Sequence, residues 1–358
     1  MLARSGALVR ASGRSTTGVA GVSEVQEGIV YLNGQFVPES EAKVPVWDRG
    51  FSGGEGVYEV TRTFRHKPFK LKEHIQRLYR SLRYTRIDCG IAPDEMERLS
   101  LEVLERNARF LGPDDDYAIW QIVSRGVQQS TIGSRKAPRT PTVTIFCLPV
   151  AFEGFAKQYV DGVMLVTPST RRLPPQSLEP KAKITNKMNH LMAAYEAQQV
   201  DPRCVPLMLD IEGNIAETHL GNFFFVQQGK LCTSTEKSVL GGITRSTLMA
   251  IADESGIPVV EGNFTPFDVY NADEAFTAST SPTITPVKSL NGIDIGDGQP
   301  GPMTLHLIKQ WNAMVGVDIV EQALAHLDGP DRQVALGTWA QIRSRDGFVP
   351  SRPRLAAE

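Results

Sequence analysis

Hydrophobic and polar residues alternate in the first part of this chain and then change to helical spacing. Residues 57–64 alternate with a period of two, which predicts a strand. Residues 71–84 carry leucine and isoleucine three and four positions apart, which predicts an amphipathic helix. Pro93 favours the start of a second helix that runs to about residue 110, because proline fits the first helical turn. Further strands are expected at residues 117–124 and 142–148.

The second half of the chain mixes short apolar runs with helices and has no regular strand–helix alternation. This irregular order favours an α+β fold over a doubly wound parallel sheet. Strands are expected at residues 162–166, 205–209, 222–226, 230–232, 274–276 and 284–287, and helices from about residue 186, at 243–254 and at 304–315.

The length of 358 residues favours two domains. Residues 1–23 contain three arginines and no acidic residue, so a mitochondrial transit peptide is the alternative to a disordered extension. We predict an N-terminal extension at residues 1–27, a small αβ domain at 28–150, a linker at 151–158, a large β-rich domain with flanking helices at 159–326, and a C-terminal tail or arm at 327–358.

Composition excludes several classes of partner. The net charge of −2 gives no support for binding to nucleic acid or to an anionic membrane. No apolar run approaches the roughly 20 residues that cross a bilayer. The four cysteines and six histidines are dispersed, which argues against a metal site and favours reduced thiols in the cytoplasm.

The candidate chemistry lies in the second half. Lys183 precedes an expected helix, and Glu217 lies 34 residues after Lys183. Residues 241–244 (GGIT) precede another helix, and Thr280 lies in a hydroxyl-rich turn. An amine that binds an aldehyde, a carboxylate for a ring nitrogen, and turns with free N–H and hydroxyl groups are the parts needed to hold pyridoxal 5′-phosphate (PLP). Their order and spacing favour a PLP site.

Each of these residues also has an ordinary structural interpretation. Lys181 and Lys187 have the same chemistry as Lys183, and each lysine could be a surface residue. Glu217 could be a solvated turn residue, and the glycine–threonine turn a plain helix cap. Arg77, a candidate for the phosphate, could instead pair with Glu73 one helical turn away.

Taken together, the motifs resemble those of the class IV aminotransferases, the fold-type IV family of PLP enzymes. The resemblance extends from about residue 29 to residue 323. It is carried by residues 48–51 (DRGF), 54–59 (GEGVYE), 73–78 (EHIQRL), 183–186 (KITN), 194–197 (AYEA), Glu217, Asn222, 242–245 (GITR), 285–287 (TPV) and 301–302 (GP).

The resemblance implies a role for each matched residue. Lys183 would form the Schiff base and move the proton, and Glu217 would face the pyridine nitrogen. Arg77, Gly242, Ile243, Thr244 and Thr280 would hold the phosphate. The resemblance also implies a two-domain fold, a homodimer, and an amino donor and a 2-oxo acid as substrates.

The chain departs from the family where the substrate is recognised. The R-x-H carboxylate trap of D-amino-acid aminotransferases is replaced at Ser130 and Ile132. The usual marks of branched-chain enzymes are absent at Gly53, Val60 and Ile119. The expected pocket residues are Tyr58, Val60, Arg62, Arg125, Thr218, His219 and Ser281, and the substrate carboxylate is assigned to Arg62, Arg125, Arg135, Lys136 or backbone amides without a choice among them.

Three functions remain open on these residues. The leading prediction is a transaminase resembling the branched-chain enzymes; Tyr58 with Val60 looks more like the D-amino-acid or (R)-amine enzymes. A PLP lyase of the aminodeoxychorismate type would share the cofactor site, and a non-enzymatic binding module would lack the Schiff base.

Overall fold

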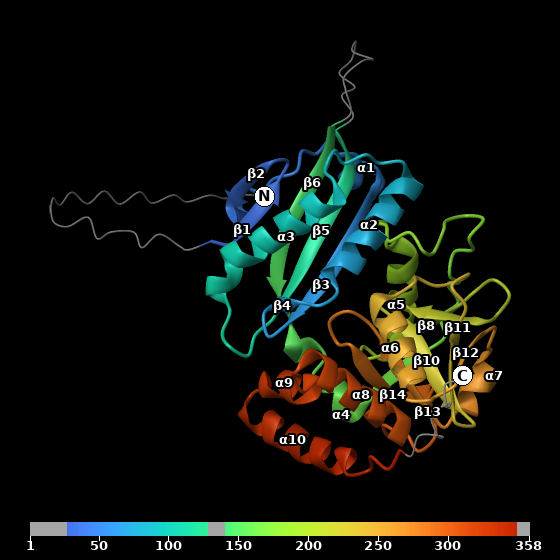
Figure 1. Cartoon of the computed structure of the whole chain (residues 1–358). Helices are drawn as coiled ribbons and strands as arrows, with labels where there is room; N and C mark the ends of the chain where they lie inside the picture. Colours follow the sequence, from blue (N-terminus) through green and yellow to red (C-terminus); the bar gives the residue numbers. More distant parts are fainter. Residues whose placement is uncertain (1–26, 128–139, 349–358) are drawn as a thin grey trace, which may run out of the picture.

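The computed structural model, which describes residues 27–127 and 140–348, shows two lobes that are each built around a sheet (Figure 1). The strands of one sheet lie between residues 29 and 149, and those of the other between residues 163 and 294. The chain combines helices with one antiparallel sheet and one mixed sheet, which confirms the predicted α+β class. The domain boundaries themselves stay a prediction.

The first lobe is an antiparallel sheet with the strand order β2-β1-β6-β5-β3-β4. Each strand expected in this part of the chain is present. Their bounds are β1 (Ile29–Leu32), β2 (Gln35–Pro38), β3 (Gly56–Phe64), β4 (Lys67–Pro68), β5 (Tyr117–Val127) and β6 (Thr140–Pro149).

Helices α2 (Leu71–Thr85) and α3 (Pro93–Asn107) cover one face of this sheet (Figure 1). The apolar stripe predicted on α2 points inward, and Leu78 of α2 and Met96 of α3 are fully buried against Ile119 of β5. Short elements complete the lobe: the 3₁₀ turns Glu39–Glu41 and Ala108–Phe110, and helix α1 (Arg49–Gly53).

The second lobe is a larger mixed sheet that closes on itself. Its path is β12-β11-β10-β13-β14-β7-β8-β9, and β9 pairs again with β10 through Glu217 and Asn222. The strands are β7 (Val163–Val166), β8 (Val205–Leu209), β9 (Ile215–Thr218), β10 (Asn222–Gln227), β11 (Lys230–Ser234), β12 (Val259–Gly262), β13 (Glu274–Ala278), β14 (Ile284–Leu290) and β15 (Ile293–Asp294).

Strand β10 explains why the sequence shows a continuous apolar run at this point. Phe223 and Phe225 belong to the core inside the ring of strands, whereas Phe224 packs on the other face in the core shared with the helices. A strand that is buried on both faces reads as an unbroken hydrophobic stretch.

Helices surround the ring and the segment that joins the two lobes. The segment at residues 151–158 packs tightly, with Phe152 and Ala156 buried. The helical elements are the 3₁₀ turn Phe152–Gly154, α4 (Gln158–Asp161), α5 (Met188–Val200), α6 (Ile243–Glu254), α7 (Pro266–Tyr270), α8 (Pro302–Val315), α9 (Ile319–Ala325) and α10 (Gly329–Arg343).

The expectation of a tail or arm from residue 327 was wrong for the part that the structure describes. Helix α10 occupies residues 329–343 and packs Ala335, Trp339 and Ile342 into the core of the second lobe (Figure 1). The stretch is rich in arginine, glycine and proline, and only three of its apolar residues are buried, so its sequence did not indicate a packed helix.

Two further predictions fall on residues outside the described ranges: the N-terminal extension up to residue 26, and Arg135 and Lys136 as candidates for the substrate carboxylate. Within the described ranges, no helix is long and apolar enough to cross a membrane.

Replacing Trp339 by alanine should lower the free energy of unfolding by about 3–5 kcal/mol, because it empties a buried site that the neighbouring helices cannot refill. Urea unfolding followed by circular dichroism measures this change. Val334→Ala on the exposed side of α10 is the matched control and should change stability by less than about 0.5 kcal/mol. Equal losses in the two variants would contradict the packing of α10.

Candidate active site

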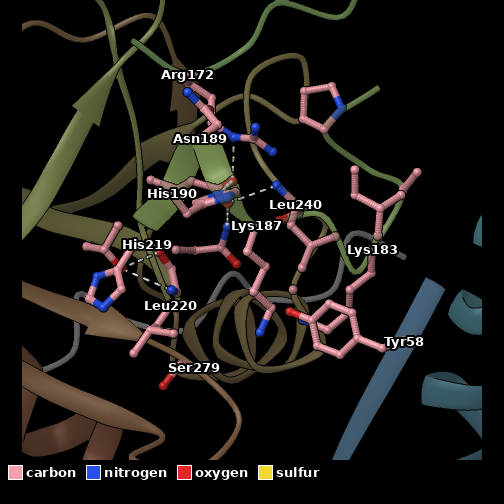
Figure 2. Close-up of a pocket in the computed structure, with 18 of the residues that line it drawn as sticks. Tyr58, Arg172, Lys183, Lys187, Asn189, His190, His219, Leu220, Leu240 and Ser279 are labelled. Atoms are coloured by element: carbon pink, nitrogen blue, oxygen red, sulfur yellow. Dashed lines mark hydrogen bonds and ion pairs between the residues drawn. The ribbon is translucent and has the colours of Figure 1, made fainter. Parts of the chain in front are cut away.

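A pocket lies between the two lobes, beside Tyr58 of β3 and the place where β9 meets β10 (Figure 2). Every residue predicted to hold the cofactor lines it: Arg77, Lys183, Glu217, Gly242, Ile243, Thr244 and Thr280. Of the residues predicted for the substrate, Tyr58, Thr218 and His219 line it as well.

The backbone of Lys183 is held by hydrogen bonds from both sides. Its carbonyl accepts a hydrogen bond from the N–H of Tyr58 at 3.0 Å, and its own N–H donates to Ser81 Oγ at 3.0 Å. The next residue, Ile184, forms a β-bridge with Val57. Lys183 therefore lies in an extended segment tied to the first lobe, and the helix expected from residue 186 begins at Met188.

The side chain of Lys183 enters the pocket with Nζ 4.6 Å from the centre of the Tyr58 ring. Burial, together with the positive charges of Arg77 and Lys187, lowers its pKa to about 8. A lowered pKa increases the neutral, nucleophilic form of the amine at physiological pH. Lys181, in contrast, is exposed and lies 3.9 Å from Glu179.

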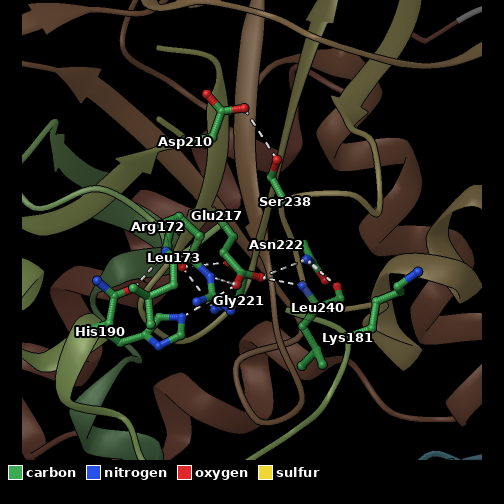
Figure 3. A network of polar contacts seen from close by, with 12 residues as sticks. Arg172, Leu173, Lys181, His190, Asp210, Glu217, Gly221, Asn222, Ser238 and Leu240 are labelled. Atoms are coloured by element: carbon green, nitrogen blue, oxygen red, sulfur yellow. Dashed lines mark hydrogen bonds and ion pairs between the residues drawn. The ribbon is translucent and has the colours of Figure 1, made fainter. Parts of the chain in front are cut away.

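Glu217 is a buried carboxylate at the centre of a polar network (Figure 3). Its oxygens accept hydrogen bonds from Arg172 Nε at 2.9 Å and from the Leu240 N–H at 3.0 Å, and they contact His190 Nε2 at 3.5 Å. Burial by itself would raise the pKa of Glu217. The contact with His190, the charge of Arg172 and the Leu240 amide outweigh burial and hold the pKa below its usual value, so the carboxylate stays charged.

The start of helix α6 forms the third part of the pocket. Gly242 is the residue before the helix, and a Cβ atom there would lie 2.2 Å from Asn222 Oδ1. Only glycine fits this close approach. Thr244 Oγ1 donates to the carbonyl of Ser279 at 2.9 Å, which joins the first turn of α6 to the loop that holds Thr280. Free N–H groups at this helix start suit an anion.

Arg77 connects this helix start to the first lobe. Its guanidinium makes two hydrogen bonds to Glu59, at 2.8 and 2.6 Å, and donates a third to the carbonyl of Gly241 at 2.8 Å. Arg77 is buried and is not paired with Glu73, so the interpretation as a helix-surface charge was wrong.

Four residues expected in the substrate pocket do not line it: Val60, Arg62, Arg125 and Ser281. Arg62 is fully buried, where it contacts Gln322 Oε1 at 2.9 Å and the carbonyl of Ser281. Arg125 is paired with Glu55 at 2.5 Å and also binds the carbonyl of Thr85.

Both arginines therefore have protein partners and lie off the pocket lining, although Nε of Arg62 makes no hydrogen bond within the described residues, and neither is placed to bind a substrate carboxylate. Val60 packs in the sheet opposite Trp120, away from the pocket lining. Arg135, Lys136, Ser130 and Ile132 lie outside the described residues.

The structure also adds residues that the sequence did not single out. Arg172 and His190 bind Glu217, and Lys187, which we considered only as a competitor of Lys183, enters the pocket. Arg172 lies in an irregular proline-rich stretch without periodicity, so nothing in its local sequence marked it as buried.

The family model for amino-transferase class IV matches residues 56–290. The chain belongs to the class IV aminotransferases.

Relatives in this family have two kinds of name. A putative branched-chain-amino-acid aminotransferase of Methanocaldococcus jannaschii is 38% identical over 285 residues, which are 79% of this chain and 94% of the relative. A D-alanine aminotransferase of Bacillus licheniformis is 31% identical over 284 residues, covering 77% of this chain and 93% of the relative.

Solved structures agree on the fold. The branched-chain aminotransferase from Thermoproteus uzoniensis, solved with norvaline, superposes with a TM-score of 0.72 at 30% identity, covering 81% of this chain and 95% of that one. The branched-chain amino acid aminotransferase from Thermobaculum terrenum in its PLP-bound form gives 0.71 at 26% identity, also covering 81% and 95%. The predicted aminotransferase fold is thereby confirmed.

We expect the Lys183 amine of the cofactor-free aminotransferase to titrate near pH 8, because burial and nearby positive charge disfavour its protonated form. About one tenth of the amine is then neutral at pH 7, against roughly 0.03% for an amine with a pKa of about 10.5. Brief labelling with acetic anhydride across pH 6–11, followed by peptide mass spectrometry, gives the midpoint. A Lys183 labelling curve without an inflection below about pH 9 would show that the site does not lower this pKa.

Proposed function

We propose that this chain is a PLP-dependent transaminase that moves an amino group between an amino acid and a 2-oxo acid. One observation carries the proposal: an amine with a lowered pKa and a charged, buried carboxylate line the same pocket as a helix start that suits an anion. These three groups match the aldehyde, the ring nitrogen and the phosphate of PLP.

When bound, PLP supplies an aldehyde that reacts with amines and a ring that takes up the electron pair left when a carbon–hydrogen bond breaks. Lys183 is the amine placed to bind the aldehyde. With PLP bound, the neutral Nζ of Lys183 would accept the proton from the substrate Cα and hold it until it is returned. A pKa near 8 suits both directions of this transfer.

Glu217 would face the ring nitrogen of bound PLP. Because Arg172 and the Leu240 N–H keep its carboxylate charged, it would stabilise the protonated form of that nitrogen. The start of α6, with Thr244, Thr280 and Arg77, would hold the phosphate.

The substrate class is proposed from the relatives. Similarity to a putative branched-chain enzyme at 38% identity favours branched-chain amino acids and their 2-oxo acids. A D-amino-acid or (R)-amine transaminase is the second candidate, supported by the D-alanine aminotransferases at 31% and 29% identity. A lyase would release its product without a second oxo acid, so regeneration of PLP by pyruvate or 2-oxoglutarate distinguishes it.

We also propose a homodimer in the cytoplasm. Helix α5 exposes Met188, Leu191, Met192 and Tyr195, which share one face at helical spacing, and Trp47 is 73% exposed on the first lobe. A second copy of the chain would cover such apolar surface. All four cysteines are free thiols, as a reducing compartment requires; the mitochondrion is the alternative if residues 1–23 are a transit peptide.

Lys183→Met should abolish the visible absorbance that depends on a lysine–PLP bond and lower the rate of the half-reaction with amino acids by at least about 1000-fold, since the proton acceptor is lost. Stopped-flow absorbance with a panel of D- and L-amino acids and (R)-amines measures both. Lys181→Met, on an exposed neighbour, is the control and should behave as wild type. If the absorbance persists in Lys183→Met and is lost in Lys181→Met, the lysine assignment is wrong.

Gly242→Ala should weaken PLP binding by about ten- to a hundredfold, because the added methyl group overlaps Asn222 and displaces the start of α6. Equilibrium dialysis of PLP gives the dissociation constant. Ser246→Ala, exposed on the same helix, is the matched control. An unchanged PLP affinity in Gly242→Ala would show that the phosphate does not bind at this helix start.

A further inference from the structure

Lys187 is a second lysine in the pocket, and the transaminase chemistry of Lys183 and Glu217 does not use it. It is the residue before helix α5, and its side chain lies beside Tyr58 (Figure 2). Its Nζ is 4.3 Å from the centre of the Tyr58 ring and 5.7 Å from that of Trp120. Two aromatic rings of the first lobe thus hold the ammonium group at a defined place in the pocket.

Unlike the two arginines of the pocket, Lys187 has no acidic partner among the described residues. Arg77 is paired with Glu59, and Arg172 with Glu217. Burial lowers the pKa of Lys187, which means that keeping the amine charged in this position costs free energy. An anion that enters the pocket would offset that cost, because an opposite charge stabilises the ammonium form.

His219 is a second unsatisfied group on this side of the site. Its Nδ1 is buried and makes no hydrogen bond within the described residues. Burial, with the positive charges of His190 and Lys187 nearby, lowers the pKa of His219 to about 4, so the ring is neutral at pH 7. The tight turn in which Thr218 Oγ1 donates to the carbonyl of Gly221 at 2.8 Å holds His219 against the pocket.

The arginines that the sequence offered for a substrate carboxylate are used elsewhere. Arg62 binds Gln322 and the Ser281 carbonyl, and Arg125 binds Glu55. An amino acid and its 2-oxo acid both carry a carboxylate that needs a positive or N–H partner once it leaves water. Lys187 is the amine in the described pocket that is free to provide it.

We propose that Lys187 binds the carboxylate of the substrate, on the side of the pocket where His219 is neutral, and that the enzyme thereby selects amino acids over amines without a carboxylate. The inference rests on the proposed transaminase function. It gives Lys187 a part in substrate recognition and leaves the reacting amine to Lys183.

The test compares Lys187→Met, which removes the charge and keeps the chain length, with Lys187→Arg, which keeps the charge. Lys181→Met is the control on an exposed lysine of the same segment. Two quantities are measured in the PLP-loaded enzyme: the dissociation constant of 4-methylvalerate, a carboxylate that cannot react, by calorimetry, and KM and kcat for leucine and for 3-methylbutylamine, which lacks only the carboxylate.

We expect Lys187→Met to raise the dissociation constant of 4-methylvalerate and the KM for leucine by about ten- to a hundredfold, the size of a lost charge-assisted hydrogen bond. Lys187→Arg should recover most of this loss. The KM for 3-methylbutylamine should change little. The substitution also removes a charge that affects the pKa of Lys183, and any change in kcat from this cause should be the same for leucine and for the amine.

An unchanged affinity for 4-methylvalerate in Lys187→Met would overturn the inference. An equal rise in KM for leucine and for the amine would also overturn it, because that result would show that Lys187 has a structural role. Failure of the transaminase proposal itself shows separately. In that case the wild-type enzyme with bound PLP would not convert it to pyridoxamine phosphate with any amino donor.

Discussion

The buried charge of Glu217 is the constraint on which the rest of this structure depends. A carboxylate removed from water is stable only when hydrogen-bond donors and positive charge surround it. Arg172, the Leu240 N–H and His190 provide them here, and each comes from a different segment of the chain. The same residue pairs with Asn222 to close the ring of strands in the second lobe. Glu217 therefore takes part both in closing the sheet and in the polar network of the site.

The contact between the lobes and the assembly of the site are likewise inseparable. Lys183 belongs to a segment that pairs with β3 of the first lobe, while Glu217 lies in the second. Arg77 joins Glu59 of the first lobe to Gly241 at the start of α6. A small rotation between the lobes would move the amine away from the carboxylate and from the start of α6. Burial between the lobes also lowers the pKa of Lys183, which increases the fraction of neutral amine at physiological pH.

Positive charge in the pocket is divided between structure and recognition. Arg77 and Arg172 neutralise buried carboxylates and so hold the site together. Arg62 and Arg125, two arginines with similar surroundings in the sequence, are placed in the interior or in ion pairs outside the pocket. Lys187 has aromatic neighbours in place of an acidic one, so its charge is available to a ligand. Which cation serves which purpose depends on its acidic partners, most of which lie far away in the sequence.

The sequence by itself predicted most of the longer strands and helices, because hydrophobic periodicity is local. It also predicted the residues that the fold brings together in one pocket, because their order and spacing are distinctive. It did not predict α10, which buries only three residues, or the ion pair between Arg77 and Glu59, which joins a helix to a strand. It assigned the substrate carboxylate to Arg62 or Arg125 among others, since a free arginine and a buried, paired one look the same in a sequence. Only the tertiary structure decides which charges are neutralised, because that depends on distances between residues that the chain brings together when it folds.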